Sequence, residues 1–143
     1  MKKDTTVRLQ TQTAFFKEMD YFVHKEAKSL GLSDSAYEIL AAIGKAEGSL
    51  AQKELADACF LSKQTINSAI KSLEKRGLIE LKKGKGGISM NEKGSQYYHE
   101  HILPFVELEK KVLEKMGEEA ALFLSLSKRY TDLYKEHLEE VLI

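Results

Sequence analysis

Residues 61–80, LSKQTINSAIKSLEKRGLIE, combine side chains suited to base and phosphate recognition with the spacing of a helix. Ile66, Ile70 and Leu73 recur at helical spacing, and Ala69 falls on the same side. This pattern predicts an amphipathic helix with a narrow apolar side. The opposite side carries only amides, hydroxyls and ammonium groups, on Gln64, Asn67, Ser68, Lys71, Ser72 and Lys75.

The polar side of this helix has the chemistry that a helix needs in the major groove of DNA. Amides pair bidentately with adenine, hydroxyls donate to or accept from base edges, and lysines contact guanine or phosphate. A carboxylate here would be repelled by the phosphate backbone, and this side has none. An ordinary solvated helix face is the alternative, and the neighbouring segments favour DNA recognition over it.

The segments around this helix predict a helix-turn-helix followed by a wing. Residues 50–60, LAQKELADACF, predict a short helix with Leu55, Ala56 and Cys59 facing inward. Ser62 is positioned to cap the next helix. After that helix, an Ile/Leu run, a glycine-rich turn with lysines and a second apolar run predict a two-stranded hairpin. The order of these elements is that of a winged helix-turn-helix.

The basic residues of the chain are concentrated in the same region. Twenty-two basic residues balance twenty-two acidic ones, so the chain has no net charge. Residues 45–93 nevertheless carry ten basic and six acidic side chains, whereas residues 94–143 carry six and ten. Residues 62–87 hold seven basic and two acidic residues, a local charge of +5. Such an excess is the electrostatic signature of a nucleic-acid-binding surface.

Two helices are predicted before the helix-turn-helix. Residues 5–29 carry an apolar stripe at helical spacing. Either Ser33 or Ser35 is placed to cap the second helix, and Glu38 lies in capping-box register with Ser35. The apolar stripe of this second helix runs through Ala36, Ile39, Leu40 and Ile43.

Two further helices are predicted after the hairpin. Asn91 or Ser95 begins the first of them, and Pro104 removes one of its backbone hydrogen bonds, so we expect a bend. The last helix starts at Glu118 and carries more apolar surface than a small monomer leaves exposed. We therefore expect a partner to cover its apolar side chains, which are Leu122, Phe123, Leu126, Tyr130, Leu133, Leu138 and Val141.

Several classes of function find no support in the sequence. Cys59 is the single cysteine, and no signal peptide or apolar run of about 18 residues is present; these features favour a reduced, cytoplasmic protein. His99 and His101 fall on different sides of a helix, so they cannot clamp a metal by themselves. No nucleophile and base pair or metal-ligand spacing suggests an enzyme. We therefore expect no catalytic residue, no metal and no cofactor.

The chain as a whole resembles the MarR family of winged helix-turn-helix regulators. The likeness covers LSDSAYEILAAIGKAEG, the segment LAQKELADACFLSKQTINSAIKSLEKRGLIE, and MNEKGSQYYHEHILPFVELEKKVLEKM. Its most specific motifs are LEKRGLI and NEKG, both in their residue order and in the number of residues between them. The resemblance implies a mainly α fold with a small β-hairpin wing, in which N- and C-terminal helices intertwine in a homodimer. Two recognition helices would then enter successive major grooves of a palindromic site, about 34–36 Å apart.

The resemblance also implies boundaries and site residues. Residues 1–143 form a single MarR-like domain, with a winged lobe at 33–90, a long linking helix at 91–116, and dimerisation helices at 1–30 and 118–143. By position, the residues facing DNA would be Ser62, Lys63, Gln64, Thr65, Asn67, Ser68 and Lys71, with Gln52 near phosphate. Family members often bind small aromatic or lipophilic effectors between the dimer base and the DNA-binding lobe. The candidate effector residues here are Phe16, Tyr37, Tyr97 and Tyr98, for which core packing is the alternative.

Two positions depart from the family pattern. Family wings usually carry an arginine that enters the minor groove, whereas the wing tip here has none. The lysines of this wing can still hold phosphates, and these are Lys82, Lys83 and Lys85. Position 68 is often arginine in the family and is serine here. The leading hypothesis is a sequence-specific, ligand-responsive transcriptional repressor that binds DNA as a homodimer. The alternative is a winged-helix module that binds a protein partner and does not read DNA.

Overall fold

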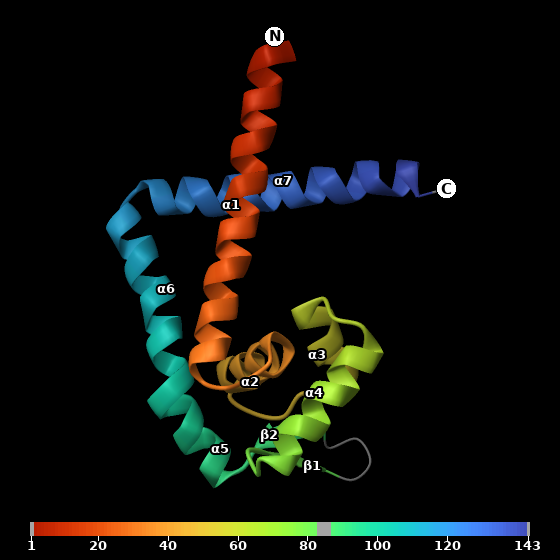
Figure 1. Cartoon of the computed structure of the whole chain (residues 1–143), viewed down its shortest axis with the longest axis vertical. Helices are drawn as coiled ribbons and strands as arrows, with labels where there is room; N and C mark the ends of the chain where they lie inside the picture. Colours follow the sequence, from red (N-terminus) through yellow and green to blue (C-terminus); the bar gives the residue numbers. More distant parts are fainter. Residues whose placement is uncertain (1, 83–86, 143) are drawn as a thin grey trace. The chain divides into compact units, whose positions relative to one another are not determined.

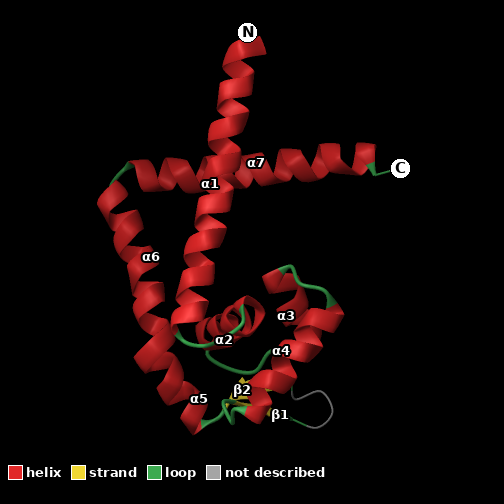
Figure 2. Ribbon diagram, viewed as in Figure 1, coloured by secondary structure: helices red, strands yellow, loops and turns green. Residues whose placement is uncertain are grey.

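The computed structural model describes residues 2–82 and 87–142. The chain is mainly helical with one short hairpin, as Figures 1 and 2 show, and the predicted fold class is confirmed. Its elements in chain order are α1 (Lys2–Ser29), α2 (Asp34–Ala46), α3 (Gln52–Cys59), α4 (Lys63–Lys75), β1 (Ile79–Leu81), β2 (Ile88–Met90), α5 (Glu92–Tyr97), the π-helical turn η2 (Tyr98–Ile102), α6 (Leu103–Met116) and α7 (Glu119–Val141).

The chain divides into two compact units, one ending at Phe105 and the other beginning at Val106. The first unit holds the apolar core, which is centred on α2, since this helix packs against α1, α3, α4, β2 and η2. The second unit comprises most of α6 and all of α7, and neither helix contains a buried residue. Assigning residues 1–30 and 118–143 to dimerisation remains a prediction.

Helix α2 begins at Asp34, with Ser33 and not Ser35 as its N-cap. The Ser33 hydroxyl accepts a hydrogen bond from the Ala36 amide at 3.1 Å, which caps the first turn. Ser35 lies inside the helix, so the alternative prediction that it caps α2 was wrong. The physical reason lies in the preceding turn, where buried Leu32 donates its amide to the Ala27 carbonyl at 3.0 Å and so sets where the helix starts. The predicted apolar stripe of α2 is buried along its length, at Ala36, Ile39, Leu40 and Ile43.

A close contact joins α2 to η2. Gly44 lies near the end of α2, and a Cβ atom at this position would overlap the ring of Tyr98. Tyr98 is buried, with 6% of its surface exposed, so its ring has little room to move aside. A glycine inside a helix costs about 1 kcal/mol relative to alanine. Here the glycine is needed because the absence of a Cβ atom leaves room for Tyr98 to pack closely on α2.

A hydrogen-bonded junction joins the end of α4 to the start of α5. Gly77 has φ 75° and ends α4 in a Schellman motif: the Gly77 amide donates to the Glu74 carbonyl, and the Leu78 amide donates to the Leu73 carbonyl. The Asn91 side chain donates to the Gly77 carbonyl at 2.8 Å and accepts from the Gly94 amide at 2.8 Å. One side chain thus satisfies a backbone group on each element.

Asn91 is therefore the N-cap of α5, one of the two residues proposed for this role. The neighbouring Gly94 is buried, and a Cβ atom there would overlap the carbonyl oxygen of Leu78. Lys93 adds a bond from its Nζ to the Arg76 carbonyl at 3.1 Å. The motifs LEKRGLI and NEKG consequently pack against each other, which gives a physical reason for their joint presence.

The hairpin is antiparallel and three residues long on each side. Ile79 pairs with Met90 and Leu81 pairs with Ile88. Ile88 also exchanges two backbone hydrogen bonds with Leu50, of 2.7 and 2.9 Å, so the segment before α3 borders β2 as an isolated bridge. The hairpin is thereby attached to both ends of the helix-turn-helix.

Pro104 lies directly after a widened helical turn. We expected a bend at this proline, and the structure shows the π-helical turn η2 just before it, with the Leu103 amide bonded to the Tyr98 carbonyl. In a regular α-helix the proline ring would clash with the carbonyl four residues earlier, which belongs to Glu100. The wider turn relieves this clash and continues the helix into α6.

Replacing Gly44 with alanine is expected to lower the free energy of unfolding by about 2 kcal/mol. Overpacking against a buried ring costs typically about 1–3 kcal/mol or more, which exceeds the helix propensity gained. Urea denaturation at fixed protein concentration measures the change. Gly48→Ala is the matched control, because a Cβ atom there meets only the Ala46 carbonyl, at 3.9 Å. Equal stability of the two variants would contradict the close contact.

Replacing Asn91 with alanine is expected to cost about 2 kcal/mol of unfolding free energy, since both a helix cap and a bond to a partly buried carbonyl are lost. Asn91→Asp separates the two effects, because aspartate can still cap α5 but cannot donate to the Gly77 carbonyl. We expect it to lose about half as much by the same denaturation measurement. If Asn91→Ala were as stable as the natural protein, the junction would contribute nothing.

Candidate nucleic-acid interface

Helix α4 is held in place by a narrow buried seam. Ile66, Ile70 and Leu73 are at most 4% exposed, and Ala69 lies beside them. Each of the three larger side chains contributes roughly 1.5–3 kcal/mol when it is fully buried. Helix α4 lies beside α2 and α3 (Figure 1) and packs against both. A helix of this length would be marginal on its own in water, so tertiary packing maintains it.

The start of α4 is fixed by Ser62, as predicted. The Ser62 hydroxyl accepts from the Thr65 amide at 3.2 Å and lies 2.9 Å from the Thr65 hydroxyl oxygen. The first turn contains no acidic residue. The unpaired amides of a helix N-terminus favour an anion, so this end of α4 is suited to a phosphate group.

The outward side of α4 is exposed and carries no carboxylate before Glu74 in the last turn. The predicted residues of α4 that are exposed to solvent are Lys63, Gln64, Asn67, Ser68 and Lys71. Ser62 is also exposed, while Thr65 is partly buried and lies beside the cap. Glu74 is the one acidic residue of α4 and lies in its last turn. The structure therefore brings the predicted α4 residues together on one accessible surface, with Thr65 at its edge.

Gln52 contacts this surface from the neighbouring helix. It is the first residue of α3, and its Nε2 donates a hydrogen bond to Oδ1 of Asn67. The start of α3 is itself held by a bond from the Ala51 amide to the Glu54 side chain at 2.9 Å. The amide of Gln52 thus belongs to the same surface as α4. Sequence reasoning did not identify this pairing, because no local signal links residues fifteen positions apart.

One of the three predicted wing lysines lies within the described residues. Lys82 is exposed at the end of β1, and its amide bonds to the Gly87 carbonyl at 2.9 Å. The other two predicted wing lysines, Lys83 and Lys85, lie outside the described residues. A phosphate contact from the wing therefore remains a prediction.

Phe60 is an unexpected feature of the turn between α3 and α4. It ends α3 in the left-handed conformation with φ 53°, which glycine adopts far more readily. Its side chain is 93% exposed. The sequence offers one signal for this feature, since a phenylalanine stands where α3 ends and a glycine is the usual choice. Neither the strain nor the exposure was predicted.

The four candidate effector residues have different surroundings. Tyr37 and Tyr98 are each 6% exposed, and the Tyr37 hydroxyl donates to Glu26 at 2.7 Å. Tyr97 is partly buried with its ring 4.7 Å from that of His101, and Phe16 on α1 is 47% exposed. Core packing therefore accounts for Tyr37 and Tyr98, and an effector role for any of the four remains a prediction.

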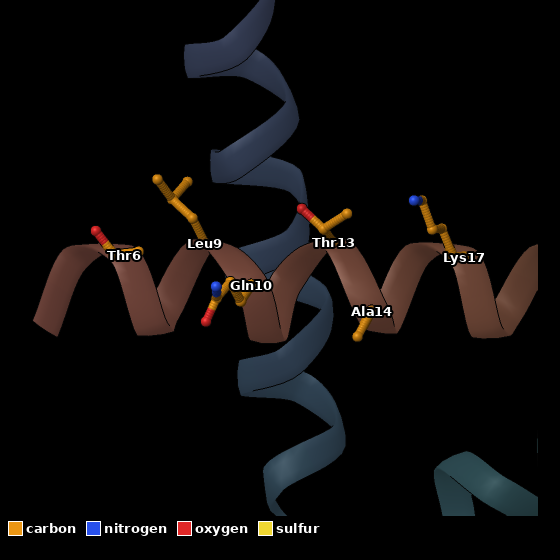
Figure 3. A pocket seen from close by; sticks show the side chains of 6 residues that line it. All are labelled: Thr6, Leu9, Gln10, Thr13, Ala14 and Lys17. Carbon is orange, nitrogen blue, oxygen red and sulfur yellow. The ribbon is translucent and has the colours of Figure 1, made fainter. Parts of the chain in front are cut away.

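A surface depression lies elsewhere, along α1. Its lining side chains extend from both sides of this single helix, as Figure 3 shows, and none of them is a candidate effector residue. They are Thr6, Leu9, Gln10, Thr13, Ala14 and Lys17. Because the lining residues come from one helix, they form one wall of a depression and not an enclosed ligand site.

The titratable groups near α3 favour a structural role for Cys59. The cysteine is partly buried, and its Sγ lies 3.9 Å from the Glu38 carbonyl oxygen. Burial raises the pKa of the Cys59 thiol, and the Glu38 carboxylate adds to this effect. Burial likewise raises the pKa of Glu38, with smaller contributions from Asp34 and Asp20. A thiol with a raised pKa is a poor nucleophile at neutral pH.

Two further searches cover the described part of the chain. Among residues 2–82 and 87–142, no group of three or more histidine, cysteine, aspartate and glutamate side chains is placed to hold a metal ion. No helix within these ranges is both long and apolar enough to cross a bilayer.

Comparison with known proteins extends the sequence resemblance. Residues 30–87 match a family model described as MarR family. This segment runs from the turn before α2 through α4 and β1 to the residue before β2. A comparison with curated proteins finds no significant match.

The fold is similar to that of several solved structures. NMB1585, a MarR family regulator from Neisseria meningitidis, is 24% identical with a TM-score of 0.75, over 93% of this chain and 98% of that one. An S. aureus MepR–DNA complex is 17% identical with a TM-score of 0.66, over 86% and 94%. NadR in complex with 4-hydroxyphenylacetate is 17% identical with a TM-score of 0.68, over 91% and 98%. At these identities the likeness establishes the fold.

Replacing Phe60 with glycine is expected to raise the free energy of unfolding by about 0.5–1 kcal/mol. Relief of the left-handed backbone is worth about 1–2 kcal/mol, and the greater freedom of glycine in the unfolded chain offsets part of it. Thermal or urea denaturation measures the difference. Phe60→Ala is the control: it removes the exposed ring but keeps the strain, so its stability should match that of the natural protein. A destabilised Phe60→Gly variant would show that the ring packs in solution.

Proposed function

The resemblance to the MarR family is confirmed, and from it we propose that the chain is a sequence-specific DNA-binding transcriptional regulator. The surface that would read DNA is the outward side of α4, with the helix N-terminus and Gln52 beside it. The observation that carries the proposal is the division of α4 into two sides. Its apolar seam is buried, while the opposite side exposes amides, hydroxyls and lysines, with no carboxylate before Glu74 in the last turn.

The roles of the individual groups follow from their chemistry. Gln64 and Asn67 can contact base edges, and Lys71 can contact guanine or a phosphate. Lys63 and the N-terminus of α4 suit a phosphate, which fixes the register of the helix in the groove. Ser68 offers a hydroxyl where family members often have arginine, so it contributes no charge. Lys82 would hold the backbone beside the groove.

We propose that the functional form is a homodimer. Helices α6 and α7 contain no buried residue, and α7 exposes large apolar side chains along its length, among them Leu122, Leu126 and Leu133. Exposed apolar surface on this scale marks an interaction site. A second copy of the chain offers the same apolar helices, so a symmetric interface would cover both sets. Such a dimer would present two α4 helices to the half-sites of a palindrome, about 34–36 Å apart.

We also propose that a bound dimer acts as a repressor whose affinity for DNA responds to a small aromatic or lipophilic ligand. A ligand that favours one spacing of the two α4 helices would change DNA affinity through that difference alone. The NadR complex with 4-hydroxyphenylacetate supports this type of effector for a protein of the same fold. Phe16, Tyr37, Tyr97 and Tyr98 stay the candidate contacts, to be tested by substitution.

The proposal predicts that replacing Gln64 and Lys71 together with alanine abolishes sequence-specific binding. Genomic fragments that the purified protein retains at physiological salt supply the operator, and gel-shift titration measures affinity. Loss of one base contact and one charged contact in each of two subunits should weaken binding roughly 100-fold or more. Affinity of the natural protein should also fall steeply as salt is raised.

The matched control replaces Gln96 and Lys28, the same residue types on exposed positions of α5 and α1. Its operator affinity should equal that of the natural protein, and sedimentation should show a dimer for all three proteins. A dimer that retains no DNA at any salt concentration would contradict the proposal. That outcome would instead support a winged-helix module for a protein partner.

A further inference from the structure

The hydrogen bond between Gln52 and Asn67 crosses from α3 to the exposed side of α4. Gln52 Nε2 is the donor and Asn67 Oδ1 is the acceptor. Gln52 is partly buried against its neighbours, whereas Asn67 is exposed. Both residues lie on rigid elements, since the start of α3 is capped and Asn67 follows the fully buried Ile66. The bond therefore turns Oδ1 of the Asn67 amide toward α3 in the protein without DNA.

An asparagine amide has two different ends. Oδ1 accepts hydrogen bonds, and Nδ2 donates them. Bidentate recognition of adenine uses both ends at once, because Oδ1 accepts from the N6 amino group while Nδ2 donates to N7. An amide oxygen can accept two hydrogen bonds, so Gln52 affects base reading through the direction in which it turns Oδ1, which is toward α3. Since the two ends point in different directions from one planar carbon, an Oδ1 turned toward α3 leaves Nδ2 turned away from it.

We propose, on the basis of the proposed function, that Gln52 is a positioning residue that sets the base preference of Asn67. With Oδ1 held by Gln52, Asn67 presents a hydrogen-bond donor to the base edge and reads a single acceptor. Purine N7 fits this role, and so does guanine O6 or thymine O4. The Asn67 contact thus tolerates more than one base, in contrast with a bidentate contact to adenine.

The same arrangement gives Gln52 a second use. Its Nε2 carries another hydrogen, which can donate to a phosphate oxygen. One amide would then link the DNA backbone to the residue that contacts the base. This link is compatible with the predicted position of Gln52 near phosphate and gives that prediction a consequence for sequence reading.

Analogue bases in the operator test the proposal. The operator position read by Asn67 is the one whose base preference changes in Asn67→Ala, and adenine is installed there. This adenine is then replaced by purine, which lacks the N6 amino group, or by 7-deazaadenine, which lacks the N7 acceptor. For the natural protein we expect purine to leave affinity unchanged and 7-deazaadenine to weaken it roughly two- to tenfold, the effect of one hydrogen bond.

The Gln52→Met variant supplies the decisive comparison, because methionine keeps the length of the side chain and removes its amide. Asn67 should then use both ends, so that purine now also weakens binding, roughly two- to tenfold. In Asn67→Ala neither analogue should matter. Lys53→Met, an exposed neighbour on α3, is the control and should keep the sensitivities of the natural protein.

The outcomes separate the two proposals. Purine sensitivity in the natural protein would overturn the inference, because Asn67 Oδ1 would then contact the base. Identical behaviour of Gln52→Met and Lys53→Met would overturn it as well. If the natural protein retained no DNA at all, the proposed function would fail and the inference with it.

A measurement without DNA tests the contact itself. In the free protein, Asn67→Ala should shift the side-chain amide resonances of Gln52 in a nitrogen-15 correlation spectrum, while Lys53→Met should not. An unshifted Gln52 amide would overturn the inference even if operator binding were strong.

Discussion

Burial of the apolar seam of α4 is the constraint on which the rest of the proposed DNA-binding surface depends. Ile66, Ile70 and Leu73 can be buried together at only one rotation of the helix about its axis. That rotation directs Gln64, Asn67 and Lys71 outward, because a helix distributes its side chains at fixed angular intervals. Burial of the seam alone therefore decides which side chains of α4 are exposed, and the bond from Gln52 additionally orients the Asn67 amide. The outward side is exposed because the other side of the helix is not.

The two ends of α4 are fixed by local hydrogen bonds, just as its rotation is fixed by burial of the seam. Ser62 determines where the helix begins, and the Schellman motif at Gly77 determines where it stops. Because both ends are fixed, the number of α4 residues that face solvent is fixed as well. A change in base preference can therefore arise from outward substitutions with little effect on folding, since exposed positions away from caps rarely alter stability by more than about 0.5 kcal/mol.

Sequence patterns predicted the elements of the winged lobe because their signals are local. Apolar periodicity placed α2 and α4, and the short polar side chains of Ser62 and Asn91 identified two N-caps. The choice between Ser33 and Ser35 could not be made in this way. Both residues can cap a helix, and the packing of Leu32 in the preceding turn decided between them.

Features that depend on distant residues were not predictable from the pattern. The bond from Gln52 to Asn67 joins two helices, and the packing of Tyr98 on Gly44 joins segments far apart in the chain. The π-helical turn before Pro104 reflects a balance between a steric clash and continued helical hydrogen bonding, which periodicity does not register. The left-handed backbone of Phe60 was missed because the sequence has an unfavourable residue there.

The junction at Asn91 has a mechanical consequence. Its side chain binds a carbonyl at the end of α4 and an amide in α5, and each bond tolerates only a small change in length. A displacement of α5 is therefore transmitted directly to the residues that precede β1. The helix after the wing and the end of α4 are thus mechanically coupled through a single side chain, in addition to the apolar packing of η2 on α2.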